Sequence, residues 1–290
     1  MAMNLDLDGL GRDFEFTETD FQAIRQLIYT YAGISLSNTK KAMVYSRVGR
    51  RLRANDFIRF CDYLDFLKAG DKVEWQAFVN GLTTNLTSFF REKHHFPILA
   101  EHVHSIGHNH PIKLWCCAAS TGEEAYTMAM TMVDVFGSYT PPVRILATDL
   151  NTQVLKTAAD GIYPMERVEN LSTDVLQRFF LKGTGNNAGC VQVRQELRDM
   201  ISFQQLNLLD ENWPIHSPFD AVFCRNVMIY FDKPTQHKVL QKIVPVMRRD
   251  ALFFAGHSEN FHHAQELFSL RGNTVYNVAN EAFHLSVSGR

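Results

Sequence analysis

The sequence lacks the patterns that identify several large classes of protein. None of its apolar runs approaches the roughly 18–20 residues of a membrane-spanning helix, and no basic segment precedes an apolar one at the N-terminus, so neither membrane insertion nor a secretory signal is expected. A G-x-G-x-x-G motif is absent, which argues against a nicotinamide-dependent dehydrogenase. The five cysteines are odd in number and have no C-x-x-C spacing, so we predict reduced core thiols in a cytoplasmic protein.

Charge and length set further bounds. The formal net charge of −2 gives no overall attraction to nucleic acid, so an electrostatic partner must be recognised locally. At 290 residues, with 46% hydrophobic and 21% charged residues, the chain is long enough for two domains or for one large α/β domain. Half of the twelve histidines fall within residues 94–110, but their spacing gives no convergent ligand set, so no metal site is predicted.

The apolar pattern changes once along the chain. Residues 14–80 repeat apolar side chains every three to four positions, which predicts helices. From Ile112 onward, short apolar runs alternate with helical stretches, which predicts the α/β class with a doubly wound, mostly parallel sheet. A Gly/Asn turn before Val191 and Val193 predicts a small antiparallel insertion. The predicted strands are Ile112–Cys117, Val143–Thr148, Met200–Gln205, Phe219–Cys224, Ala251–Ala255 and Thr274–Val278, and residues 282–287 could close a terminal hairpin.

The turn after the first predicted strand carries most of the chemical information. Residues 114–124 read Leu-Trp-Cys-Cys-Ala-Ala-Ser-Thr-Gly-Glu-Glu, an apolar run followed by small residues and two acids. Small residues let a ligand approach the backbone, and ligands of open α/β sheets bind at the carboxyl ends of strands. Two carboxylates would repel a phosphate but suit a ligand with hydroxyls and positive charge. S-adenosylmethionine, with its ribose, ammonium and sulfonium, fits this turn.

Five motifs along the chain together resemble one family. They are Asn85–Arg91 (Asn-Leu-Thr-Ser-Phe-Phe-Arg), Ala119–Glu124, Ala147–Leu150, Phe223–Phe231 and Gly256–Asn260. In this order and at this spacing they closely resemble the bacterial chemotaxis receptor-glutamate methyltransferases, the CheR family. The resemblance runs from about residue 14 to about residue 276.

The resemblance implies an enzyme of chemotactic adaptation, which methylates receptor glutamates with S-adenosylmethionine to give γ-methyl esters and S-adenosylhomocysteine. It implies a helical receptor-docking domain over residues 1–84 and a methyltransferase domain over residues 85–290, with a β-subdomain inserted at about 178–199. The expected partners are the cytoplasmic domains of chemotaxis receptors and their C-terminal pentapeptide, which the β-subdomain would bind, although Gln192 stands where the family favours Arg. Nucleic acid is not an expected partner, and a monomer is expected.

The resemblance also assigns cofactor-binding residues. Taken alone, Asp149 fits either a ribose contact or a helix cap, Asn207 fits a turn, and Arg225 is a cation in an apolar stretch that needs a partner. The family implies that Glu124 contacts the cofactor, whereas Glu123 is expected on the surface. The implied cofactor-binding residues are Asn85, Thr87, Arg91, Glu124, Asp149, Asn207, Leu208, Arg225 and Asn226.

Arg91 and Tyr230 are the candidate catalytic residues. A glutamate with a pKa near 4.3 is already ionised at neutral pH, so the reaction needs proximity, alignment and partial desolvation rather than a general base. The resemblance places Tyr230 beside the transferred methyl group, and it folds Arg91 over the cofactor, where Arg91 could orient the carboxylate or serve the cofactor alone. Without the family, Asn85–Arg91 would read as a turn entering a helix, with Thr87 or Ser88 as its cap.

A basic stretch lies in the predicted helical domain. Residues 40–53 hold six basic residues and no acid, and on a helical wheel several of these cluster beside an apolar face. A solvated face or a nucleic-acid contact would explain such a stretch, but the family docks this helix on acidic receptor helices. The candidate substrate-binding residues are Lys40, Arg47, Arg50, Arg51 and Arg53.

Other functions explain the sequence less well. The Asp/Asn-Pro-Pro-Tyr/Phe motif of nucleobase amino-methyltransferases and the Pro-Cys nucleophile of cytosine-C5 methyltransferases are both absent. A non-catalytic scaffold that senses the cofactor and binds a partner through the basic helix remains an alternative. The presence of Arg91, Glu124, Asp149 and Tyr230 favours the enzyme.

Overall fold

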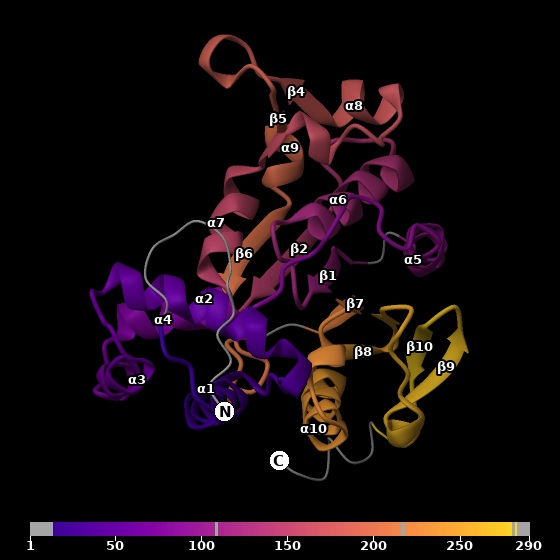
Figure 1. The fold of residues 1–290 in the computed structure, drawn as a ribbon. Coiled ribbons are helices and arrows are strands. Elements are labelled where there is room, and N and C mark those ends of the chain that lie inside the picture. The colour runs from indigo at the N-terminus through magenta and orange to yellow at the C-terminus, as the bar shows by residue number, and fades with distance from the viewer. Residues whose placement is uncertain (1–13, 108–109, 216–217, 280–281, 283–290) are drawn as a thin grey trace. The chain divides into compact units, whose positions relative to one another are not determined.

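The computed structural model describes residues 14–107, 110–215, 218–279 and 282. The chain forms two compact units, Met1–Thr84 and Asn85–Arg290 (Figure 1). No helix within the described ranges has both the length and the apolar character needed to cross a membrane.

The first unit is helical, as predicted. Local signals define its helices, since Thr17 forms a capping box with Asp20 at the start of α1, Gly33 ends that helix with a φ of 68°, and Asp71 caps α4. Buried aromatic rings, such as those of Phe60 and Tyr63, form much of its core. The elements are α1 (Glu18–Ala32), the 3-10 turn η1 (Asn38–Lys40), α2 (Lys41–Ala54), α3 (Phe60–Lys68) and α4 (Lys72–Leu82).

The second unit is built on a seven-stranded sheet with the order β6-β2-β1-β7-β8-β10-β9. The first five strands in this order pair in parallel, while β10 is antiparallel to β8 and β9, which confirms the mostly parallel sheet. Strand β9 was not predicted, and the expected hairpin at 282–287 lies, apart from Ala282, outside the described residues. The strands are β1 (Ile112–Cys116), β2 (Val143–Asp149), β6 (Ile201–Gln205), β7 (Phe219–Cys224), β8 (Met247–Ala255), β9 (Phe268–Gly272) and β10 (Val275–Val278).

Helices cover the two faces of this sheet. Cys116 packs in a core with α5 and α6, and Cys117 packs in a second core with α10, so neighbouring residues of one strand reach opposite faces. Cys116, Cys117 and Cys224 are buried as predicted, but Cys61 is exposed and Cys190 is only partly buried, so the prediction of core cysteines was wrong for these two residues. The helices are α5 (His95–Ile106), α6 (Glu123–Phe136), α7 (Thr152–Asp160) and α10 (Lys233–Ile243), the last capped by Asp232 as its sequence indicates.

The predicted insertion is an antiparallel sheet of three strands, in the order β3-β5-β4. Its first strand precedes residue 178, so this β-subdomain draws on more of the chain than the expected hairpin. Its elements are β3 (Ile162–Pro164), η2 (Met165–Arg167), α8 (Thr173–Phe179), β4 (Phe180–Lys182), η3 (Gly185–Asn187), β5 (Cys190–Val193) and α9 (Gln195–Arg198).

The strand order also locates a topological switch point between β1 and β7. The chain proceeds from β1 to β2 on one side and from β7 to β8 on the other, so the segments that leave β1 and β7 diverge. Open α/β sheets bind ligands at this kind of switch point, beyond the carboxyl ends of the strands.

Candidate active site

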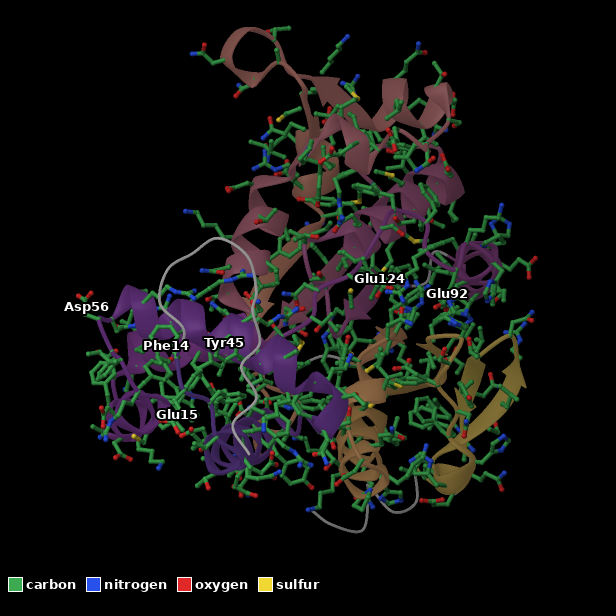
Figure 2. The ribbon with its side chains drawn as sticks, in the orientation of Figure 1. Phe14, Glu15, Tyr45, Asp56, Glu92 and Glu124 are labelled. Atoms are coloured by element: carbon green, nitrogen blue, oxygen red, sulfur yellow. The ribbon has the colours of Figure 1, made fainter. Side chains whose placement is uncertain are left out.

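A buried cation lies at the switch point. Arg225 follows β7, and its guanidinium donates hydrogen bonds to Glu124 of α6 (Nη1–Oε2, 2.7 Å) and to the carbonyl of Arg91 (Nη2–O, 2.6 Å). Glu92 pairs with the same guanidinium, with 3.3 Å between its Oε2 and Nη2. Figure 2 labels the two carboxylate residues, Glu92 and Glu124. A buried cation needs a partner, and Arg225 has two, the carboxylates of Glu92 and Glu124 from separate segments of the chain.

Glu92 was not identified from the sequence, because nothing local signals that the acid after Arg91 pairs with a distant arginine. Although burial opposes its ionisation, Arg225, together with hydrogen bonds from His257 and Asn226, lowers the pKa of Glu92 to about 2. Two carboxylates around one guanidinium leave the cluster with a net negative charge. Such a site suits a ligand that carries an ammonium or a sulfonium.

Asp149 ends β2 and is buried. Its Oδ2 accepts a hydrogen bond from the backbone N–H of Ser120 (2.8 Å), and its Oδ1 accepts one from that of Asn151 (2.9 Å). Burial raises the pKa of the Asp149 carboxyl, while these backbone donors oppose the rise. The cap of α7 is Asn151, so Asp149 is not the helix cap. Each carboxylate oxygen can accept a further hydrogen bond, which leaves capacity for a ribose hydroxyl.

Several residues at this edge have a strained backbone. Phe90, Glu92, Ser120 and Asn226 have φ values of 54°, 51°, 49° and 58°, in the left-handed region that side chains disfavour. Hydrogen bonds hold these conformations, for example from the N–H of Phe90 to Thr127 Oγ1 (3.1 Å). Strain of this kind is common at functional sites, where the surrounding structure maintains it.

The segment before α5 is irregular and His94 precedes the helix, so the alternative interpretation of Thr87 or Ser88 as a helix cap is wrong. Ser120 Oγ donates to the carbonyl of Asn85 (2.9 Å), which attaches the segment to the turn after β1. Arg91 donates through Nη1 to the carbonyl of Leu86 (2.9 Å) and so closes a turn within its own segment. The structure thus brings the main chain of this segment to the same edge as Glu124, Asp149 and Arg225.

The other predicted cofactor residues occupy loops at the same edge. The Oδ1 of Asn207 accepts a hydrogen bond from the N–H of Leu209 (3.0 Å), which is the turn that the residue type alone predicts. Leu208 is buried in the core that α10 covers, and its carbonyl accepts a hydrogen bond from Lys242 (2.8 Å). Tyr230 lies in the 3-10 turn η4 (Met228–Tyr230), and its partly buried ring packs against the same core.

A second carboxylate missed in the sequence organises the loop after β7. Glu259 is buried and accepts hydrogen bonds from the N–H groups of Asn226 (3.0 Å), Ile229 (3.2 Å) and Gly256 (2.6 Å). Its position three residues after Gly256, within a recognised motif, was the only available signal. Glu259 therefore fixes the backbone that carries Arg225 and Tyr230.

The prediction for Glu123 was wrong. It was expected on the surface, but it is fully buried, pairs with Arg167 and accepts a hydrogen bond from Thr121 Oγ1 (2.6 Å). Its partner arises in the β-subdomain, more than forty residues away in the chain, so the local pattern could not reveal its burial.

The basic residues of positions 40–53 fall into two groups, one bound within the helical unit and one exposed. Arg47 donates to the carbonyls of Gly81 (3.3 Å) and Thr83 (2.7 Å) at the end of α4, and Arg51 forms a bidentate pair with the buried Glu74 (2.9 and 2.5 Å). These two arginines hold the helical unit together. The exposed members of the predicted substrate-binding set are Lys40, Arg50 and Arg53.

Three of the histidines between residues 94 and 110 form hydrogen bonds with other parts of the protein. The Nε2 atom of His95 lies 2.9 Å from the carbonyl of Asn273, and burial lowers the pKa of this histidine to about 4. His102 contacts the carbonyl of Asp220, and His110 contacts its carboxylate (2.7 Å). Across residues 14–107, 110–215, 218–279 and 282, His, Cys, Asp and Glu form no group of three suited to a metal ion.

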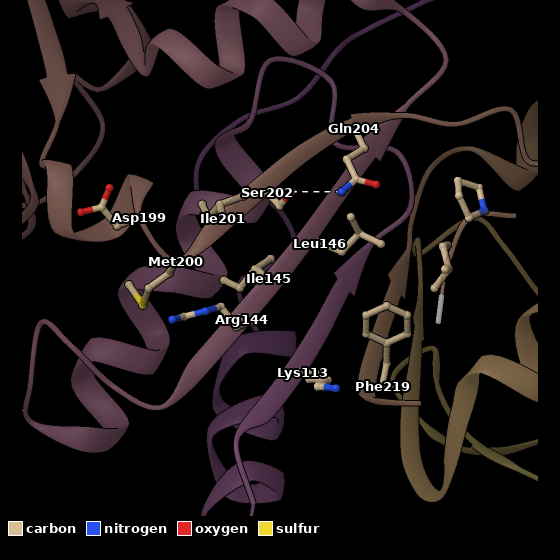
Figure 3. A pocket seen from close by; sticks show the side chains of 12 residues that line it. Lys113, Arg144, Ile145, Leu146, Asp199, Met200, Ile201, Ser202, Gln204 and Phe219 are labelled. Carbon is tan, nitrogen blue, oxygen red and sulfur yellow. Dashed lines mark hydrogen bonds between the residues drawn. The ribbon is translucent and has the colours of Figure 1, made fainter. Parts of the chain in front are cut away.

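A cavity of about 430 Å³ lies away from this edge (Figure 3). Its lining includes Lys113 and Arg144 near the amino ends of β1 and β2, Phe219 at the start of β7, and Ser202 and Gln204 of β6. None of the predicted site residues lines it, so the cavity is not the predicted site.

The residues at the carboxyl edge fit S-adenosylmethionine. The negative cluster at Glu124 suits its positive groups, and Asp149 keeps acceptor capacity for a ribose. Within the described part of the chain, no side chain caps α6 after Gly122, so the first N–H groups of this helix can receive a carboxylate.

Comparison with known proteins identifies the family. The CheR methyltransferase all-alpha domain matches residues 19–83, and the CheR methyltransferase SAM-binding domain matches residues 85–277. Chemotaxis protein methyltransferase 2 of Pseudomonas aeruginosa is 49% identical over 269 residues, which cover 92% of this chain and 96% of that protein. The chemotaxis protein methyltransferase of Escherichia coli is 48% identical over 266 residues, which cover 91% of this chain and 92% of that protein. This chain therefore belongs to the CheR family of S-adenosylmethionine-dependent methyltransferases.

Proposed function

We propose that this enzyme methylates glutamate side chains of chemotaxis receptors and thereby adjusts receptor signalling. The carrying observation is the Glu92–Arg225–Glu124 cluster, which lies at the switch point with the buried Asp149 at the end of the neighbouring strand β2. A negative cluster and a ribose acceptor at one sheet edge match the two ends of the cofactor. The products would be a γ-methyl ester and S-adenosylhomocysteine.

The chain's residues bind and orient rather than move protons. When bound, the cofactor would supply an electrophilic methyl group on its sulfonium, which a receptor carboxylate oxygen would accept, with the C–S bonding electrons left on the sulfur of S-adenosylhomocysteine. In this proposal Asp149 holds the ribose, and Glu124 with Arg225 holds the methionine end. Because the carboxylate is already ionised at neutral pH, alignment and exclusion of water provide most of the rate enhancement.

Arg91 and Tyr230 are the proposed orienting groups. The Tyr230 hydroxyl would donate to the incoming carboxylate, since the residue follows the Arg225–Asn226 pair on the loop that Glu259 fixes. Arg91 uses one N–H on the carbonyl of Leu86, and its other donors can serve the carboxylate or the cofactor.

Receptor docking is proposed for the exposed cations Lys40, Arg50 and Arg53, whereas Arg47 and Arg51 bind groups of α4. Arg53 also lies over the ring of Phe14, 5.2 Å from its centroid. Changing both Arg50 and Arg53 to Glu should raise the apparent KM for the receptor and make this KM less dependent on salt concentration. The affinity for S-adenosylhomocysteine should stay unchanged. Arg59→Glu is the matched control, since it reverses another exposed arginine of the same unit. An equal rise in KM in this control would show that receptor docking does not depend specifically on the basic residues of positions 40–53.

The β-subdomain is the proposed site for a receptor's C-terminal pentapeptide. Ile162 and Leu181 are exposed and lie on either side of Gln192 in the strand register. Titration of a receptor-tail peptide into wild type and Gln192→Arg tests this docking.

We further propose that the enzyme acts as a cytoplasmic monomer.

Receptor-dependent release of S-adenosylhomocysteine tests the function. The enzyme, S-adenosylmethionine and a receptor cytoplasmic fragment should release S-adenosylhomocysteine, whereas omission of the fragment should abolish the release. Product formed at the same rate without the fragment, or no product with fragments that carry the glutamates, would overturn the proposal.

A further inference from the structure

The β-subdomain contacts the turn that follows β1. The hydroxyl of Tyr163 in β3 donates to the carbonyl of Thr121 (2.6 Å), and the backbone of Gly122 lies against the same hydroxyl. A Cβ atom at Gly122 would lie 3.0 Å from that hydroxyl and 2.8 Å from Cβ of Ala158, and the residue has a φ of 98°. The turn is therefore packed closely against Tyr163 and α7.

Arg167 joins two segments of the proposed cofactor site. Its Nη2 pairs with the fully buried Glu123 in the first turn of α6, and the same nitrogen donates to the carbonyl of Thr87 (3.1 Å). A buried carboxylate requires a partner, so Glu123 holds Arg167 in place and Arg167 in turn holds Thr87.

Aromatic packing adds a third connection. Phe89 is buried between Tyr163 and Phe180 of the β-subdomain, with ring centroids 5.1 and 5.3 Å away and edge-to-face geometry. The segment that contains Asn85, Thr87 and Arg91 is thus attached to the β-subdomain by both a ring contact and a charged side chain.

We infer that Tyr163 and Arg167 are positioning residues of the cofactor site, through which the β-subdomain holds the turn after β1 and the segment 85–91 in the geometry that binds S-adenosylmethionine. This inference rests on the proposed role of those two segments. It gives the β-subdomain a function in cofactor binding that is independent of any peptide on its outer surface.

Calorimetric titration with S-adenosylhomocysteine tests the inference. Tyr163→Phe removes one hydroxyl and should weaken affinity about three- to tenfold, and Arg167→Ala should weaken it about tenfold or more, because a charge-assisted bond is stronger than a neutral one. Arg167→Lys keeps the charge and should recover most of the affinity. The KM for S-adenosylmethionine should rise in the weakened variants while the KM for the receptor fragment stays unchanged.

Arg178→Ala is the matched control, because Arg178 also joins the β-subdomain to α6 but pairs with Asp134, far along the helix from the cofactor turn. Its affinity should stay within about twofold of wild type. Equal losses in Arg167→Ala and Arg178→Ala would show that the effect is general destabilisation and would overturn the inference. Unchanged affinity in a folded Tyr163→Phe would overturn it as well, even if Arg167→Ala fails to fold. Absence of binding by the wild type would instead contradict the proposed cofactor site itself.

Discussion

Glu92→Gln should destabilise the methyltransferase unit at neutral pH. Glu92 has a side chain that is only 10% exposed and pairs with a guanidinium that is fully buried. Glutamine keeps the size of the side chain but removes the charge, and its amide nitrogen would place a donor beside the donors of Arg225. Arg225 would then keep a single carboxylate partner, Glu124.

The magnitude follows from the pKa of Glu92, which falls from 4.5 to about 2 in the folded protein. At about 1.4 kcal/mol per pKa unit, and with allowance for partial solvent screening, the charged side chain contributes about 2–3 kcal/mol to the free energy of unfolding. Because the folded-state pKa is depressed, this contribution is complete above about pH 4.5 and is lost as the pH falls toward about 2.

Urea unfolding of wild type and Glu92→Gln measures this contribution. The difference in free energy of unfolding should be constant from neutral pH to about pH 5 and should narrow below about pH 4.5. Glu101→Gln is the control, since Glu101 is exposed on α5, and it should match wild type. If Glu92→Gln were as stable as wild type at neutral pH, the account of Arg225 as a cation balanced by two carboxylates would be wrong.

Three further substitutions test other parts of the site and fold. Asp149→Ala should weaken S-adenosylhomocysteine binding at least tenfold in calorimetry, because each charge-assisted hydrogen bond to the ribose contributes roughly 1.5–3 kcal/mol, and a folded variant with unchanged affinity would exclude Asp149 from the site. Tyr230→Phe should lower the single-turnover methylation rate about two- to tenfold with cofactor affinity near wild type, since one neutral hydrogen bond is lost, and a wild-type rate would limit Tyr230 to packing. Arg51→Ala should lower the unfolding free energy of the helical unit by about 2–3 kcal/mol, because it removes the cation that pairs with the buried carboxylate of Glu74, and an unchanged urea midpoint would contradict that role.

Local periodicity was sufficient to predict the architecture. Short apolar runs such as Ala221–Cys224 predict central strands, and their alternation with amphipathic stretches predicts a parallel sheet. The edge strand β9 was missed because four of its five residues, Ser269 to Gly272, are at least partly exposed, so no apolar run marks it.

The position of a candidate site residue in the fold was predictable where the residue's own strand determines it. It was unpredictable where a distant residue determines which contacts the side chain makes. Asp149 and Arg225 follow directly from strand ends. Glu123 is buried and Glu92 is largely buried because partners from the β-subdomain and from the loop after β7 reach them, and no local pattern encodes such pairing. The same limit explains Arg51, which looked like a docking residue but pairs with Glu74 of another helix.

The position of the transferred methyl group tests the central claim most directly. A receptor cytoplasmic fragment would be incubated with the enzyme and isotopically labelled S-adenosylmethionine, digested, and sequenced by tandem mass spectrometry with and without alkali. The label is expected on glutamate side chains as an ester that alkali removes, and labelling at limiting cofactor should fall at least severalfold when Asp149→Ala replaces the wild type. Label on lysine or on another residue, stable to alkali, would contradict it.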